Sequence, residues 1–115
     1  MSMQYSVIPT SHFENDLKRL KKRNKNIIGD IKNTLEELEV GIFKGDEVFS
    51  YQQGEHIFKV RVINSNNNKG KSSGYRMIYY VIKDERDVYL LTIYSKSEQS
   101  NITKSEIQKI IKKCI

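Results

Sequence analysis

The sequence has little of what disulfide-bonded, metal-binding or membrane proteins need. Its one cysteine, Cys114, cannot form an internal disulfide, and its two histidines, His12 and His56, belong to no recognisable metal-ligand spacing. No run approaches the roughly 18 apolar residues of a membrane span. Residues 1–9 also lack the charged start and apolar core of a secretory signal. We therefore expect a cytoplasmic protein with no membrane contact, no metal site and no cofactor.

The residues that are abundant are basic. Among 115 residues there are 20 Lys and Arg against 14 Asp and Glu, which gives a net charge of +6. This length predicts one domain over residues 1–115. Such a charge favours a polyanionic partner, although lysines spread over a solvated surface would give the same total. The densest basic run, residues 18–23, is either the solvated face of a helix or a contact for phosphates or an acidic partner.

The first half predicts a strand followed by two helices. Residues 4–9 are typical of a short strand, and Ser11 with Glu14 has the spacing of a capping box that begins a helix. Apolar residues recur at helical spacing after Ser11 and again over residues 27–38. Gly41 is a typical helix stop. The two helices are expected to form a hairpin.

From Val48 the sequence changes to a strand pattern, which predicts three or four strands before a final helix. Residues 57–63 alternate, with Phe58, Val60 and Val62 on one face and Lys59 and Arg61 on the other. We expect the apolar face to pack on the helices and the other face to be cationic.

Two further strands and a helix complete the predicted α+β fold. Residues 75–82 and 88–94 are β-branched or aromatic and are joined by a charged turn, which indicates a hairpin. Thr103 and Glu106 repeat the capping-box spacing before a short C-terminal helix.

A phosphate-binding P-loop is excluded. Gly70-Lys71-Ser72 has the end of that motif, but position 65 is Ser rather than Gly and the segment leads into a strand, not a helix. No serine or cysteine nucleophile motif is present either.

What remains is a concentration of cations and tyrosines on the strands and their loops. Cations bind phosphates and aromatic rings stack on unpaired bases. From the residues alone, a binding face without catalysis and an active site are equally supported. The residues are Lys59, Arg61, Lys69, Lys71, Arg76 and Lys96, interleaved with Tyr75, Tyr79, Tyr80 and Tyr94.

In four blocks, residues 58–62, 69–76, 78–80 and 90–98, the sequence resembles the RelE-like toxins of bacterial toxin-antitoxin systems, and most closely the HigB-type branch. The resemblance implies a compact RelE-like α+β fold, in which an N-terminal strand and helical hairpin pack on an antiparallel sheet, with a short C-terminal helix and the helices on one side of the sheet. It implies a ribonuclease that enters the ribosomal A site and cuts messenger RNA without a metal, by attack of the ribose 2′-hydroxyl on the adjacent phosphate.

The resemblance also implies roles for single residues. Lys59 is the leading candidate for the base, with His56 as its rival. Arg61 is expected to bind phosphate and Arg76 to stabilise the transition state. Ser97 stands where RelE itself has an arginine, and no tyrosine follows Tyr94, so Tyr94 and Lys96 are the nearest candidates for the leaving-group acid and the base-stacking group. RNA binding is expected from Lys69, Lys71, Tyr75 and Tyr80.

The expected partners are the ribosome, messenger RNA and a cognate antitoxin of helix-turn-helix type, with operator DNA reached only through the antitoxin. Two alternatives stay open. One is a toxin of the related ParE branch, which inhibits gyrase and does not cut RNA. The other is a non-catalytic nucleic-acid-binding module.

Overall fold

The structure, a computed structural model, describes residues 4–65 and 74–115. Its strands and helices follow the predicted order, and the two long strands after residue 74 lie within one residue of their predicted bounds. No helix in these ranges is long and apolar enough to cross a bilayer. In chain order the elements are β1 (Ser6–Pro9), α1 (Ser11–Lys21), α2 (Ile27–Glu39), β2 (Asp46–Ser50), β3 (Glu55–Val62), β4 (Tyr75–Ile82), β5 (Asp87–Ser95) and α3 (Lys104–Cys114).

The strands form one mixed sheet with the order β1-β5-β4-β3-β2. The pairs β2–β3, β3–β4 and β4–β5 are antiparallel, as predicted, whereas β1 joins the edge of the sheet parallel to β5. Parallel neighbours need a long connection in the sequence. Here that connection consists of every element from α1 to β4. β4 is the central strand, with β3 on one side and β5 on the other.

The pairing of β4 with β5 contains a bulge. Ile78 lies opposite Thr92, but the next residue, Tyr79, lies opposite Leu90. Leu91 is therefore an extra residue in β5. Because side chains alternate between the two faces of a strand, one extra residue reverses which face each later side chain occupies.

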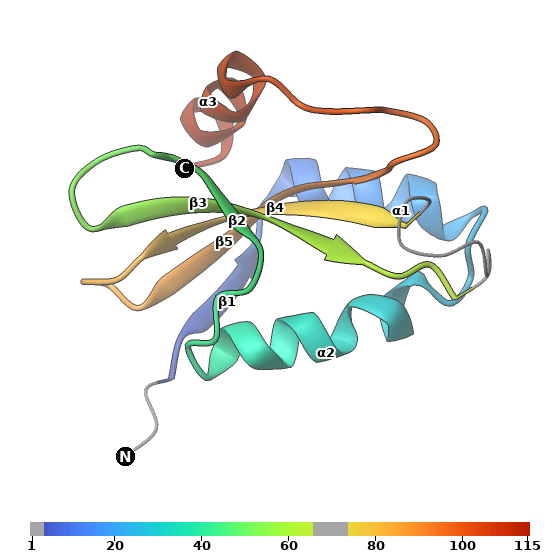
Figure 1. Ribbon diagram of the computed structural model, residues 1–115, viewed down its shortest axis with the longest axis horizontal. Coiled ribbons are helices and arrows are strands. Elements are labelled where there is room, and N and C mark those ends of the chain that lie inside the picture. The colour runs from blue at the N-terminus through green and yellow to red at the C-terminus, as the bar shows by residue number, and fades with distance from the viewer. Residues whose placement is uncertain (1–3, 66–73) are drawn as a thin grey trace.

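Both faces of the sheet are covered, each by a different set of helices (Figure 1). The hairpin α1–α2 packs on one face, which we call the hairpin face, through Phe13, Leu20 and Ile31. α3 packs on the opposite face, the α3 face, through Ile107 and Ile110. The expectation that all helices lie on one side is therefore wrong. The reason is the composition of β4 and β5, whose apolar side chains point to both faces and need two covers.

The helix ends explain the geometry of the connections. The predicted capping box at Ser11 and Glu14 is wrong by one residue: Thr10 is the N-cap of α1 and accepts from the Phe13 amide at 3.2 Å. Thr10 also donates to the Leu90 carbonyl at 2.8 Å, so the same hydroxyl fixes α1 to β5. The capping box of α3 is confirmed, with Thr103 as N-cap and Glu106 reaching back to it.

Candidate functional site

Three of the predicted site residues form a row across the centre of the sheet. Arg61 of β3 lies opposite Arg76 of β4, and Arg76 lies opposite Tyr94 of β5. Directly opposed residues project from the same face, with Cβ atoms about 5 Å apart. Ile78 is two residues from Arg76 in β4, so the two side chains project from the same face. Ile78 packs in the core under α3, and the row therefore lies on the α3 face. The alternation of β3 and the bulge in β5 together bring the three side chains together.

The two arginines of the row are like charges placed opposite each other, an arrangement that destabilises a sheet. Arg61 is exposed, whereas Arg76 is only 6% exposed. Within the described residues no aspartate or glutamate forms an ion pair with either. The guanidinium of Arg76 donates instead to the backbone carbonyl of Tyr75 at 3.2 Å. Burial, and next the charge of Arg61, lower the pKa of Arg76. A bound anion would supply the missing countercharge.

Tyr94, the third member of the row, has a buried hydroxyl group that donates no hydrogen bond within the described residues. Its side chain is 3% exposed, and its hydroxyl is buried with no hydrogen-bond partner among the residues described. Burial raises the pKa of Tyr94, Arg76 opposes that shift, and Glu106 adds to it. The hydroxyl is therefore neutral at physiological pH and is a donor that the protein itself leaves unused.

The two lysines predicted for the site lie at different distances from the row. Lys59 is two residues from Arg61 on the same face of β3, about 7 Å along the strand. Its ammonium donates to the side chain of Asn101 at 3.4 Å. Lys96 follows the end of β5, and its ammonium donates to the Ser100 carbonyl at 2.8 Å. Lys59 thus borders the row, whereas Lys96 holds the loop before α3.

Comparison with known families settles what kind of protein carries this row. A family model described as the RelE toxin of the RelE/RelB toxin-antitoxin system matches residues 13–114. The chain belongs to the RelE toxin family. A RelE-family toxin functions within a toxin-antitoxin system, so a cognate antitoxin is implied.

A solved structure of a RelE protein has the same fold. The E. coli toxin RelE, in the free state and with two arginines replaced by alanine, is 21% identical in sequence and superposes with a TM-score of 0.58. The match covers 95% of this chain and 99% of that one. The predicted RelE-like α+β fold is therefore confirmed.

His56 does not lie with the row of this RelE-family chain. His56 is two residues from Phe58 in β3 and projects from the same face, the hairpin face. The centroids of the two rings are 6.2 Å apart. Its Nδ1 lies 2.6 Å from the carboxylate of Glu47, and this hydrogen bond is the main reason why the pKa of Glu47 is lowered. The sheet separates His56 from Arg61 and Arg76, which leaves Lys59 as the candidate base on the α3 face.

The aromatic residues proposed for RNA binding are core residues. Tyr75 is fully buried on the hairpin face, because it alternates with Arg76. Tyr80 lies on the α3 face but is only 4% exposed, and its hydroxyl donates to Glu55. Neither ring is available to stack on a base. Lys69 and Lys71 lie outside the described residues.

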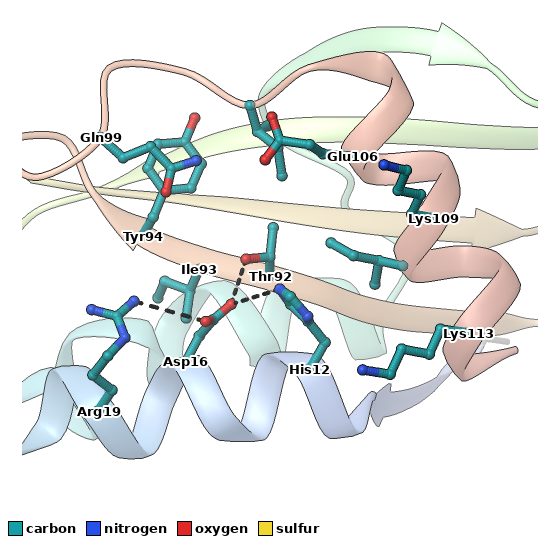
Figure 2. A pocket seen from close by; sticks show the side chains of 12 residues that line it. His12, Asp16, Arg19, Thr92, Ile93, Tyr94, Gln99, Glu106, Lys109 and Lys113 are labelled. Atoms are coloured by element: carbon teal, nitrogen blue, oxygen red, sulfur yellow. Dashed lines mark hydrogen bonds and ion pairs between the residues drawn. The ribbon is translucent and has the colours of Figure 1, made fainter.

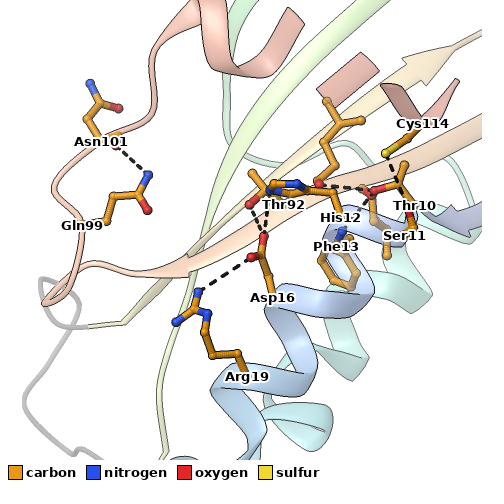
Figure 3. A network of polar contacts seen from close by, with 12 residues as sticks. Thr10, Ser11, His12, Phe13, Asp16, Arg19, Thr92, Gln99, Asn101 and Cys114 are labelled. Carbon is orange, nitrogen blue, oxygen red and sulfur yellow. Dashed lines mark hydrogen bonds and ion pairs between the residues drawn. The ribbon is translucent and has the colours of Figure 1, made fainter. Parts of the chain in front are cut away.

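The structure adds a polar cluster beside the row that the sequence reading missed. Asp16 of α1 accepts from the Thr92 hydroxyl at 2.5 Å and lies 3.4 Å from His12 (Figure 3). His12 and Asp16 are four residues apart, a spacing that places two side chains on one face of a helix. That signal was available in the sequence, but nothing indicated that Thr92 would lie against them. No three His, Cys, Asp or Glu side chains in residues 4–65 and 74–115 gather closely enough to hold a metal ion.

Proposed function

We propose that this RelE-family toxin is a ribosome-dependent endoribonuclease that cuts messenger RNA in the A site and so stops translation. The observation that carries the proposal is the opposed pair Arg61 and Arg76, which has no acidic partner among the described residues and costs stability. A cost of this kind is typical of functional sites, where charges are held ready for a ligand. A phosphate diester supplies the matching negative charge.

The proposed reaction uses only the RNA and the protein. The 2′-oxygen forms a bond to phosphorus while the bond from phosphorus to the 5′-oxygen breaks, which leaves a cyclic phosphate and a 5′-hydroxyl. Lys59, in its neutral form, takes the proton of the 2′-hydroxyl. The Tyr94 hydroxyl gives a proton to the departing 5′-oxygen, and Arg76 opposite it stabilises the resulting tyrosinate.

Arg61 and Arg76 act on the phosphate itself. The pentavalent intermediate carries more negative charge than the diester, so two fixed guanidinium groups stabilise it more strongly than they stabilise the substrate. Arg76 is held in place by burial and by its bond to the Tyr75 carbonyl. Its position is therefore set before RNA binds, and little reorganisation is needed during the reaction.

The proposed partners follow from the same reaction. The ribosome presents the messenger RNA, and the cognate antitoxin, which we propose to be of helix-turn-helix type, blocks ribosome entry or covers the cationic row. Operator DNA is then contacted only through the antitoxin. The proposed site of action is the cytoplasm, where translating ribosomes are found.

The test is Arg76→Ala, assayed on translating ribosomes and by growth arrest. We expect loss of cleavage with the fold retained. The matched control is Lys25→Ala, which removes one exposed positive charge in the connection between α1 and α2, and it should cut as the wild type does. Retained cleavage in Arg76→Ala contradicts the assignment. DNA damage with intact messenger RNA would instead indicate a gyrase inhibitor, and nucleic-acid affinity without any cleavage would indicate a binding module.

A further inference from the structure

A cavity of about 410 Å³ adjoins the row and is not used by the proposed reaction. It lies between α1, β5 and α3, with Asp16 and Thr92 at one side and Glu106 and Lys109 at the other (Figure 2). Tyr94 belongs to both places, because it lines the cavity and lies opposite Arg76 in the sheet. A phosphate bound on the row would therefore bring the neighbouring nucleotide to the mouth of the cavity.

The carboxylate of Asp16 in this cavity can accept a further hydrogen bond. Oδ2 of Asp16 is engaged by the Thr92 hydroxyl at 2.5 Å and lies 3.4 Å from Nε2 of His12. Among the described residues only Arg19 approaches Oδ1 of Asp16, in an ion pair at 3.7 Å that is too long for a hydrogen bond. The carboxylate is thus fixed by one oxygen and can accept a further donor with the other (Figure 3).

The rest of the lining suits a nucleotide. Ile102 and Ile110 provide apolar walls against which a flat base can pack. Lys109 and Lys113 of α3 are exposed at the rim, and neither forms an ion pair within the described residues. The apolar walls match the base, the carboxylate matches an amino group on the base, and the cations at the rim match the phosphate.

We propose that this cavity binds the base next to the cut phosphate and selects a base with an exocyclic amino group over uracil. The amino group of cytosine can donate to Oδ1 of Asp16, as acidic side chains accept from this group in nucleic-acid complexes. Uracil has a carbonyl at that position, and its only ring donor is flanked by two oxygens that repel a carboxylate. This inference rests on the proposed function, because it is the row that brings RNA to the cavity.

Direct binding tests the cavity without any cleavage. The full isotope-labelled chain is titrated with CMP and with UMP, which differ mainly in the group at ring position 4, and the backbone amide signals of Asp16, Thr92 and Ile93 are followed by NMR. We expect CMP to shift them at a concentration at least about tenfold lower than UMP, the size expected for one hydrogen bond to a charged acceptor. Equal affinities, or no shift with either nucleotide, would overturn the inference.

Two variants and a control identify the acceptor. In Asp16→Asn the difference between CMP and UMP should fall to less than about threefold, and Thr92→Val, which frees the carboxylate, should reduce it as well. Glu14→Gln makes the same change of charge on the same helix but lines no part of this cavity, and it should keep the full difference. If one of the two variants does not fold, the other decides.

A cleavage assay separates this inference from the proposed function. On translating ribosomes, Asp16→Asn should still cut but lose its preference for the base beside the cut, with the change appearing in KM rather than kcat. Cutting with an unchanged preference would overturn the base pocket and leave the ribonuclease assignment standing. If the wild-type protein cuts nothing while the cavity still distinguishes CMP from UMP, the proposed function fails and the base selection stands.

Discussion

The substitution Arg76→Met is expected to make the protein more stable while it abolishes cleavage. Arg76 is 6% exposed and is opposed by Arg61, with no acidic partner in the described residues. Removing an incompletely compensated buried cation gains about 1–3 kcal/mol. Removing the like-charge pair adds about 0.2–1 kcal/mol. Losing the hydrogen bond to the Tyr75 carbonyl costs about 1 kcal/mol.

The middle values of these ranges give a net gain of about 1–2 kcal/mol. Methionine has a similar length and fills the same space with apolar atoms, so no cavity term is added. The rise in Tm is this gain divided by the entropy of unfolding, which is about 2.1 cal/mol/K per residue. For a chain of this length the expected rise is about 4–8 °C. The assay is thermal unfolding followed by circular dichroism in low salt, with Lys25→Met as the control of equal charge change. That control should leave Tm within about 2 °C of the wild type, as surface substitutions usually do.

Inorganic phosphate provides the second half of the test. A ligand that binds only the folded protein stabilises it by about 2.7 kcal/mol at a concentration one hundred times its Kd. Phosphate should therefore raise the Tm of the wild type and of Lys25→Met but not that of Arg76→Met. The reasoning is refuted if Arg76→Met unfolds below the wild type, or if phosphate stabilises all three proteins equally.

Two further predictions concern the surroundings of the row. Burial raises the pKa of Tyr75 to about 12 from an ordinary value of 10.0, so its contribution to stability is complete below pH 10 and is lost as the pH rises towards 12. Tyr75→Phe should remove about 1.4 kcal/mol of this alkaline loss, measured by urea unfolding at pH 8 and pH 11; equal losses in both proteins would contradict it. A Cβ at Gly45, where φ is +102°, would lie 2.3 Å from the carbonyl oxygen of Lys59. Gly45→Ala should therefore lower the free energy of unfolding by about 2–4 kcal/mol, and it should slow cleavage because it displaces Lys59. The control Gly29→Ala, where an added Cβ has nothing within 4 Å, should do neither. Equal stabilities of the two variants would contradict the prediction.

The sequence was informative wherever one face of an element is apolar and the other polar. In β3 the alternation of Val60 and Val62 with Lys59 and Arg61 predicted both the strand and the face of the cations. The same parity could have shown that His56 projects from the opposite face, because it lies an odd number of residues from Lys59 and Arg61. The resemblance of local sequence suggested His56, but strand geometry argues against it.

The sequence was uninformative where both faces of a strand are covered. β4 is buried along almost its whole length, so no alternation distinguishes Tyr75, which projects from the hairpin face, from Arg76, which projects from the α3 face. The arginine inside this run is the one exception to its apolar character, and the family resemblance singled it out as a candidate site residue. The cavity beside the row could not be predicted, because it depends on how α1 and α3 approach β5 from two distant parts of the chain.

The extra residue in β5 has a consequence for how relatives of this protein should be aligned. Leu91 has no partner in β4, and the residues on its two sides, Leu90 and Thr92, pair with the consecutive residues Tyr79 and Ile78. A relative that lacks a residue at this position would have a regular strand and would still place the equivalent of Tyr94 opposite that of Arg76. A one-residue gap between Thr92 and Tyr94 would instead shift this pairing and turn the tyrosine to the other face. The position of a gap in β5, and not its presence, is therefore the criterion for recognising relatives that share the row.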